Sequence, residues 1–508
     1  MILEKDSNMI HRVFSQRKWL GYSCLSLSMV ACSSDDPTIV DMTTAGNTGV
    51  GGTASQGAAG TGTSTTPTAG ASGAAPAALG MGGGAGMGGG AGAGGAANMD
   101  GSVEVSGDIA ADTTWTKDKT YILTDQTFVV GNSTLSIEPG TKILGGGLGS
   151  ALIVTRGSRL EAVGTAAEPI VFSSNIPAGL RDPGDWGGVA LLGAATTNVA
   201  APLLEGIEVE GNGAYGGTDD AHNCGTLKYV RIEFAGFELS PDNELNGLTL
   251  AGCGTGTTID FVQVHRGSDD GIEVFGGKVD IKHAVITNVQ DDSLDWDFGW
   301  TGRAQFLVVR HDADASDAGF EADNGNPSTE ATPRSEPSIF NATLVGSAGS
   351  ASPGLVLRRG TWGNIHNAII TGFPVSGIDI RDAFSVAGTA LAPPRLVLSN
   401  SIFFQNGEAG LEHADAEPID GTTGDDDGGF DEDAFLRSEA LANRFDVDPG
   451  LPAPSDVTAP NLLPAAGSSA STGGATPPEG FDVTATYVGA LEPGGTDWTQ
   501  GWTAYPEN

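Results

Sequence analysis

The sequence is 508 residues long and strongly acidic. Asp and Glu supply 63 residues and Lys and Arg only 24, which gives a formal net charge of -39 at pH 7. A surface with this charge attracts cations and repels nucleic acid, so a nucleic-acid-binding function is excluded.

Residues 1–31 are predicted to be an export signal, because basic residues precede an apolar run that is too short for a permanent membrane-spanning helix. The run ends in MVAC at positions 29–32, which resembles the lipobox of bacterial lipoproteins. Ser33 follows the Cys, and the absence of Asp at this position resembles lipoproteins that are sent on to the outer membrane. The resemblance implies cleavage before Cys32 and a lipid on its sulfur, which would anchor the protein at the outer membrane or cell surface. Secretion without an anchor is the alternative.

Residues 32–100 are predicted to be a flexible linker behind that anchor. Gly, Ala, Ser and Thr dominate them, as in the stretch GMGGGAGMGGGAGAGG, and leave too little apolar surface to offset the entropy of ordering. A flexible linker of this length has a root-mean-square reach on the order of 45 Å.

Residues 101–450 are predicted to be all-β, because two short strand patterns alternate along them. The first is apolar-x-apolar, as in Val262-Gln263-Val264, and the second begins with a small residue, as in Gly271-Ile272-Glu273-Val274. The offset from Val262 to Gly271 is 9 residues and recurs in later units, although the Leu307 and Ala342 units stretch to 12. The second pattern recurs after 22 residues from Gly271 to Ser293, after 26 from Ser293 to Gly319 and after 23 from Gly354 to Gly377. Two strands per coil with Gly and Asn turns, and no helical stretch between them, predict a parallel β-helix. Residues 451–508 are expected to pack on this β-helix or to cap it.

Several segments strengthen this interpretation by resemblance. They are LSIEPGTKI, GDWGGVALLG, GTLKYVRIEFAG, DDGIEVFGG, DDSLDWDFG and YVGALEPGGTDWTQGWTAY. Over nearly all of residues 108–508 the chain resembles a broad family of bacterial exported lipoproteins of right-handed β-helix type, which has no settled activity. The architecture is similar to that of pectate lyases and polygalacturonases. The His-Gly and Arg-x-Lys motifs of the polygalacturonases and the His-bearing strand of the lyases have no match in the sequence.

Two cysteines are expected to form a disulfide. Cys24 lies in the predicted signal and Cys32 at the lipid site, which leaves Cys224 and Cys253 in the exported domain. An oxidising compartment favours a bond between them.

The second pattern predicts a wall of acidic side chains. Side chains alternate along a strand, so Glu273 and Phe275 face outward if Ile272 and Val274 face the core. Stacking the coils then gives two outward columns. The first is Thr249, Glu273, Asp295, Glu321, Val356, Asp379 and Glu412. The second is Ala251, Phe275, Asp297, Asp323, Arg358, Arg381 and Ala414. Trp296 falls on an inward position, where its size raises the possibility of a local shift in this alternation.

Acids stacked about 4.8 Å apart must be neutralised. One solution is a hard cation such as Ca²⁺ held by carboxylate oxygens. The candidate ligands are Asp270, Glu273, Asp292, Asp295, Asp297, Glu321 and Asp323. Protonated carboxyls with raised pKa values are a second solution, and pairing of Arg358 and Arg381 with Asp323 and Asp379 is a third. Asp270 and Asp292 lie in turns, where capping of the backbone is an alternative to cation binding.

The leading functional hypothesis is recognition of extracellular polysaccharide or a cell-surface glycan by this wall, assisted by calcium, in a monomeric protein. A polysaccharide lyase or glycoside hydrolase is the first alternative, by analogy with the carboxylates and arginines of the enzymes named above. Its candidate catalytic residues are Asp295, Asp297, Asp323 and Arg358. The candidate substrate-binding residues are Arg358, Arg381, Trp300 and Trp362, although a Trp can equally close a turn. A structural or adhesive surface protein without catalysis is the second alternative.

Overall fold

The computed structural model describes residues 101–207, 211–240, 243–312, 316–325, 330–350, 352–411 and 427–508. The predicted export signal, the linker and Cys32 lie outside these ranges, and so do Glu412 and Ala414 of the predicted columns. Within the described ranges, no helix is long and apolar enough to cross a membrane.

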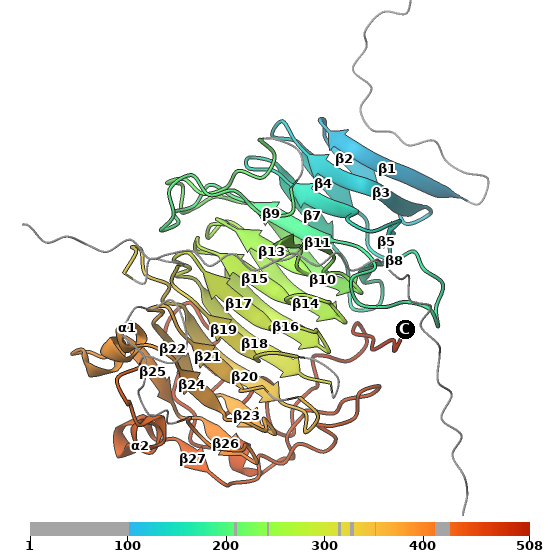
Figure 1. Ribbon diagram of the computed structural model, residues 1–508. Helices are drawn as coiled ribbons and strands as arrows, with labels where there is room; N and C mark the ends of the chain where they lie inside the picture. The colour runs from blue at the N-terminus through green and yellow to red at the C-terminus, as the bar shows by residue number, and fades with distance from the viewer. Residues whose placement is uncertain are drawn as a thin grey trace, which may run out of the picture. The chain divides into compact units, whose positions relative to one another are not determined.

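The described residues form the right-handed parallel β-helix that the repeat and the resemblance predict (Figure 1). Strands of successive coils pair in parallel and present three faces. The first, called the acidic face, begins with the end of β3 (Thr120–Val129). It continues through β6 (Ala151–Val154), β9 (Gly188–Leu192), β13 (Leu248–Ala251), β15 (Ile272–Phe275), β17 (Leu294–Asp297), β19 (Phe320–Ala322), β21 (Leu355–Leu357) and β24 (Ile378–Ile380).

The second face, called the covered face, starts at β1 (Ser102–Ile109) and β3. It runs through β5 (Lys142–Gly145), β8 (Ile170–Ser174), the later halves of β10 (Gly225–Glu233), β14 (Thr258–His265), β16 (Asp280–Thr287), β18 (Arg303–Arg310) and β20 (Ser338–Val345), and then β23 (Ile369–Thr371), β26 (Ile402–Phe404) and β27 (Arg444–Phe445). The third face comprises β2 (Thr113–Trp115), β4 (Thr134–Ile137), β7 (Arg159–Val163), the earlier halves of β10 to β20, β22 (Gly363–His366) and β25 (Leu396–Ser399).

Five strands contribute to both the third face and the covered face: β10, β14, β16, β18 and β20. Each of them changes direction because one of its residues adopts a left-handed conformation. These residues are Tyr229, Phe261, His283, Phe306 and Asn341, with φ between 51° and 64°. The first four stack their rings along the helix axis, with centroid distances of 4.5, 4.2 and 4.8 Å. The stack fixes the corner between the covered face and the third face.

Other elements are few and short. The small antiparallel pair is β11 (Glu238–Ser240) with β12 (Asn243–Glu244). The helices are α1 (Ala383–Val386) and α2 (Glu432–Leu436), with 3-10 turns at Ala387–Ala390, Glu439–Leu441 and Ser469–Ser471.

The C-terminal segment lies along the outer side of the covered face. The Gln263 side-chain amide exchanges two hydrogen bonds with the backbone of Ala504, at 2.7 and 2.9 Å. Val285 and Val308 of the covered face pack with Trp502 in an apolar cluster. This segment therefore occupies the covered face, while the acidic face carries the predicted acids.

Candidate functional site

The register of the acidic face matches the predicted first column. Glu273 pairs with Thr249 and with Asp295, Asp295 pairs with Glu321, and the column continues through Val356 to Asp379. The inward and outward alternation of side chains is not shifted at Trp296. Its side chain is 1% exposed inside the coil and its Nε1–H donates to Thr361 Oγ1 at 3.1 Å. Asp295 and Asp297 on either side of it therefore point outward.

The outward acids are nevertheless buried, which the sequence did not predict. Glu273, Asp295, Asp297 and Glu321 keep only 7–9% of their surface exposed. A chain segment between β9 and β10 contributes the cover, because its Tyr215 packs on Phe275 with ring centroids 6.1 Å apart. Removal from water makes every unneutralised charge in this face costly.

Arginines neutralise one end of the column. The Arg358 guanidinium donates to Asp323 Oδ1 at 3.0 Å and also bonds the Glu321 carboxylate. Arg359, which was not predicted from the sequence, donates to the second carboxylate oxygen of Asp323. Arg381 Nε donates to Asp379 Oδ2 at 2.9 Å. Pairing by arginine, one of the three predicted solutions, thus accounts for this end of the face.

No Lys or Arg of the described residues forms an ion pair with Asp270, Glu273, Asp292, Asp295 or Asp297 at the other end. Burial, followed by the charge of Asp295, raises the pKa of both Asp270 and Glu273 well above the usual range. Burial and the neighbouring carboxylates raise the pKa of Asp292 and Asp295 in the same way, and that of Asp297 to about 8. Protons or a bound cation would each neutralise these groups.

Asp270, Glu273 and Asp295 form the most enclosed group, called the inner triad. Each offers a carboxylate oxygen, and these oxygens lie within 4.8 Å of one another. Asn246 Nδ2 donates to Glu273, while Asn246 Oδ1 and Asp295 Oδ1 are both buried without a hydrogen-bond partner. Carboxylate oxygens at this spacing are typical ligands of Ca²⁺, which also accepts amide oxygens. The residues therefore fit such an ion.

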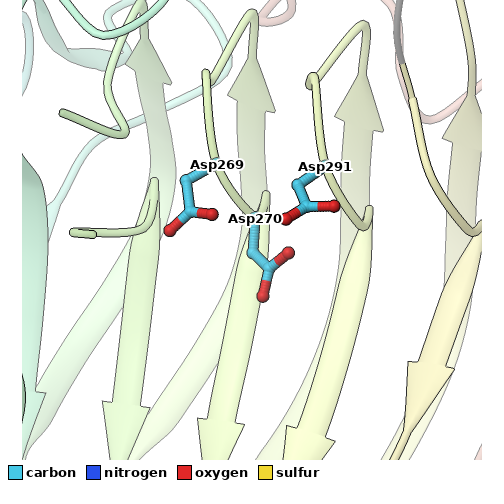
Figure 2. Close-up of side chains that lie close together, drawn as sticks. All are labelled: Asp269, Asp270 and Asp291. Carbon is cyan, nitrogen blue, oxygen red and sulfur yellow. The ribbon is translucent and has the colours of Figure 1, made fainter. Parts of the chain in front are cut away.

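Two further acidic groups lie in the turns before β15, β17 and β19. One comprises Asp269, Asp270 and Asp291, whose side chains lie close together on neighbouring coils (Figure 2). The other repeats it one coil later with Asp291, Asp292 and Asp317. The predicted capping is also present, because Asp270 Oδ1 accepts the Asp292 N–H at 3.0 Å and Asp292 accepts the Ala318 N–H. Asp270 thus caps the next coil while belonging to the inner triad.

The prediction that Trp300 binds a substrate is wrong. Its ring is 0% exposed in the core, and its Nε1–H donates to the Val279 carbonyl at 3.0 Å. Trp362 is half-buried, with Arg334 over its ring at 4.2 Å and its Nε1–H bonded to Phe384 O at 3.1 Å. Both indoles satisfy their N–H on the backbone of a neighbouring coil or loop, as a Trp that closes a turn does.

Three further residues at this site were not predicted from the sequence: Asn246, Tyr215 and Phe298. A signal for Asn246 was present, since it precedes Gly247 as Asp270 precedes Gly271, and so occupies the same column. Tyr215 carries no such signal because it comes from a loop outside the repeat. Phe298 follows Asp297 and stacks on Phe275 with centroids 5.5 Å apart, next to the acids.

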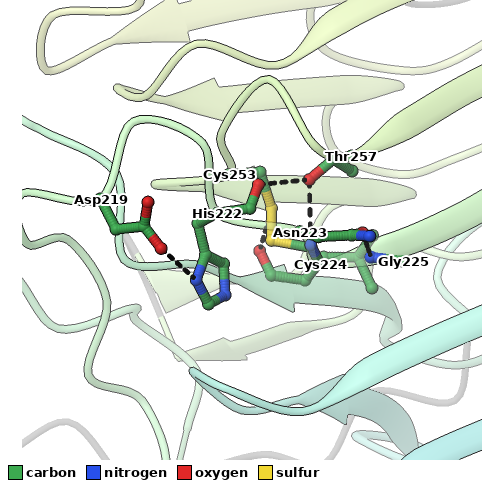
Figure 3. The surroundings of a disulfide bond; sticks show 8 residues. Asp219, His222, Asn223, Cys224, Gly225, Cys253 and Thr257 are labelled. Atoms are coloured by element: carbon green, nitrogen blue, oxygen red, sulfur yellow. Dashed lines mark hydrogen bonds and ion pairs between the residues drawn. A yellow bond between two sulfur atoms is a disulfide. The ribbon is translucent and has the colours of Figure 1, made fainter.

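The predicted disulfide between Cys224 and Cys253 is present, with Cα atoms 5.9 Å apart (Figure 3). It joins the residue directly before β10 to the turn after β13. The Cys224 N–H donates to Thr257 Oγ1 at 3.0 Å. The bond therefore fixes two coils directly before the inner triad.

Replacing both cysteines by Ala is expected to destabilise the fold. A cross-link over a sequence separation of 29 residues contributes about 3–4 kcal/mol to the free energy of unfolding in the chain-entropy model. Guanidinium titration of the oxidised protein, the reduced protein and the double variant checks this, and the last two are expected to share one lowered midpoint. Identical midpoints for all three would contradict it.

Comparison with known proteins places this site in context. The model of the pectate-lyase-like β-helix domain family matches residues 107–422, which include the whole acidic face described above. Among solved structures, the chain is similar to the periplasmic alginate epimerase AlgG at 12% identity, over 59% of this chain and 74% of that chain, with a TM-score of 0.24. None of the curated proteins matches this chain. The chain belongs to the pectate-lyase-like β-helix domain family.

Proposed function

We propose that the acidic face binds an extracellular carbohydrate with the help of Ca²⁺ held at the inner triad. One observation carries the proposal: Asp295 Oδ1, in a side chain that is 9% exposed, has no hydrogen-bond partner. A buried carboxylate oxygen without a partner costs free energy that a bound cation recovers. The nearby Asn246 Oδ1 supplies a second such atom.

The chemistry of the triad favours calcium over softer metals. The donors are carboxylate and amide oxygens, whereas zinc prefers histidine and cysteine. Calcium takes 6–8 oxygen ligands, and the inner triad with Asn246 supplies fewer groups than that. Water, or hydroxyl or carboxylate oxygens of a ligand, would fill the remaining positions.

The carbohydrate assignment rests on family membership and on the residues beside the triad. The family is described as pectate-lyase-like, which names a carbohydrate-acting protein. Phe298 is half-buried next to Asp297 and stacks on Phe275, and we propose that the remaining part of its ring contacts the apolar side of a sugar. Together with the lipid anchor proposed at Cys32 or with secretion, these features describe a protein that meets glycans outside the cell.

Catalysis on the same face is the second candidate function. Burial, followed by the charge of Asp323, raises the pKa of Asp297 to about 8, so it carries a proton at neutral pH. Its neighbour Asp323 is paired with Arg358 and Arg359. A protonated carboxyl beside an ion-paired carboxylate is the arrangement that general acid–base catalysis uses.

One experiment tests both candidates. The full-length protein is offered acidic and neutral polysaccharides with Ca²⁺ or with EDTA, while retention, new reducing ends and unsaturated uronates are followed. Retention that requires Ca²⁺ and vanishes in Asp295→Asn, but not in the exposed control Asp108→Asn, supports binding. Reaction products that the wild type forms and Asp297→Asn does not form would show that the protein is an enzyme. Absence of retention and of product in the wild type with Ca²⁺ contradicts both.

A further inference from the structure

Side chains of neighbouring coils hold the end of the C-terminal segment on the covered face. This end, residues 502–508, is called the latch. Arg231 Nη1 donates to the Trp502 carbonyl at 3.1 Å, and the Gln263 side-chain amide exchanges its two hydrogen bonds with Ala504. Among the residues that the structure describes, no strand pairs with the latch. A small number of side-chain contacts therefore decides whether the latch stays attached.

His265 makes one of these contacts. Its side chain is 1% exposed, and its Nε2 lies 2.9 Å from the Pro506 carbonyl oxygen. Because a carbonyl oxygen only accepts, this nitrogen carries the proton and donates it. The other ring nitrogen, Nδ1, lies 2.8 Å from Thr287 Oγ1, whose hydroxyl donates to it. The neutral imidazole therefore satisfies both of its nitrogens.

No carboxylate of the described residues forms an ion pair with His265. Glu233 lies beside it on β10, but this carboxylate accepts from Arg231 Nε at 3.0 Å and from Ser173 Oγ at 2.9 Å. On the other side, β16 contributes Thr287, which does not titrate. A second proton on His265 would therefore place an unpaired charge in a buried site, which costs free energy.

The other charged groups around His265 also oppose a positive charge there. Arg266 follows it directly, and Arg310 lies on β18, two strands further along the covered face. Burial is the largest cause that lowers the pKa of His265 to about 4, and the charges of these two arginines act in the same direction. On the latch, burial raises the pKa of Tyr505, which is therefore neutral in acid, and Glu507 is exposed.

We propose that His265 makes the latch a pH-sensitive device, in which proton uptake by the imidazole releases residues 502–508 from the covered face. Detachment exposes the imidazole to water, where its pKa is near 6.5. Because the pKa is about 4 in the attached state, the stability of attachment is fully present above pH 6.5 and is lost as the pH falls toward 4. The equilibrium for detachment is expected to increase about 30-fold between pH 7.5 and pH 5. This device is independent of the function proposed for the acidic face.

Hydrogen–deuterium exchange of the full-length protein tests the device. The reporters are the Ala504 N–H, which donates to Gln263 Oε1, and the Gly179 N–H, which donates to the carbonyl of the last latch residue at 3.1 Å. After correction for intrinsic exchange rates, their protection factors are expected to fall about 30-fold from pH 7.5 to pH 5. The Ala490 N–H, which donates to Thr343 Oγ1 in an earlier part of the C-terminal segment, should keep its protection.

The variant His265→Gln is expected to abolish the pH dependence. The Gln amide donates to the Pro506 carbonyl but does not bind a proton, so the protection factor of Ala504 should be the same at pH 7.5 and pH 5. The matched control is His366→Gln, because burial also lowers the pKa of His366 to about 4 but its Nδ1 bonds Ser399 rather than the latch. A loss of Ala504 protection in acid that survives in His265→Gln would overturn the proposal.

A second measurement on the wild type decides the matter if Gln fails to hold the latch at pH 7.5. Exchange of the imidazole C2 hydrogen with pH reports the pKa of His265 itself. A pKa well below 6.5, together with loss of protection at Ala504 in acid, supports the device. A pKa near 6.5, or equal losses of protection at Ala490 and Ala504, would show that the latch is not released by this histidine.

Discussion

Calcium is expected to raise the unfolding temperature of the wild-type protein by several degrees and to leave that of Asp295→Asn unchanged. Binding only to the folded state at 100 times the dissociation constant contributes about 2.7 kcal/mol, which corresponds to a shift on the order of 5 °C for a domain of this size. Asp295 contributes the buried oxygen without a partner, and an amide at that position lacks the negative charge that attracts the cation. Thermal unfolding in EDTA and across a calcium titration measures the effect.

The same variant is expected to be more stable than the wild type in EDTA. Without a cation, Asp295 faces Glu321, Asp323 and Asp297, and an amide at that position relieves their repulsion at nearly the same volume. One substitution thus has opposite effects with and without calcium, which general damage to the fold does not produce. Asp108→Asn, at an exposed position of β1, is the control and should respond to calcium as the wild type does. A calcium-dependent shift that survives in Asp295→Asn would refute the inner triad as the binding site.

The fold could be predicted because the repeat carries its own register. The 9-residue offset that begins at Val262 aligns Glu273 with Asp295, and the small residue that opens the second pattern adds Glu321 although the offset of its unit is 12 residues; the structure has these pairs. A parallel β-helix buries its core between coils of one pattern, so local sequence spacing determines which residues stack. The same argument placed Asp295 outward, because a large Trp296 could still fit inside beside Phe320.

Burial of the acids could not be predicted, because their cover comes from outside the repeat. Tyr215 belongs to a connection between coils, and no periodicity relates it to Phe275 or Glu273. The error over Trp300 has a similar origin. A Trp after a strand can turn toward solvent or back into the coil, and only the position of the Val279 carbonyl decides this. Loop conformation, rather than strand register, sets the depth of the site.

The calcium-free protein is expected to lose stability as the pH rises from about 4 to about 8. Burial is the first cause that raises the pKa of Asp297 to about 8, and that of Glu321 and Asp269 to about 7. Unfolded carboxyl groups titrate near pH 4. Between the unfolded pKa values near 4 and the folded pKa values of about 7 to 8, the folded state binds more protons than the unfolded state. The stability that these protons contribute is therefore fully present below pH 4 and is lost as the pH rises through the folded pKa values.

Calcium should reverse much of this loss, because the cation replaces the protons and their release accompanies binding. Denaturant titrations between pH 4 and 9, with EDTA and with excess Ca²⁺, are expected to give a falling curve in EDTA and a flatter one with calcium. General repulsion in an acidic chain also lowers stability with rising pH, so Asp297→Asn serves as the comparison. This substitution removes one carboxyl group whose pKa is raised. In EDTA, the free energy of unfolding of the variant should therefore fall less steeply near pH 8 than that of the wild type. A wild-type curve that rises with pH in EDTA would show that the buried acids of this face are ionised and already neutralised within the fold.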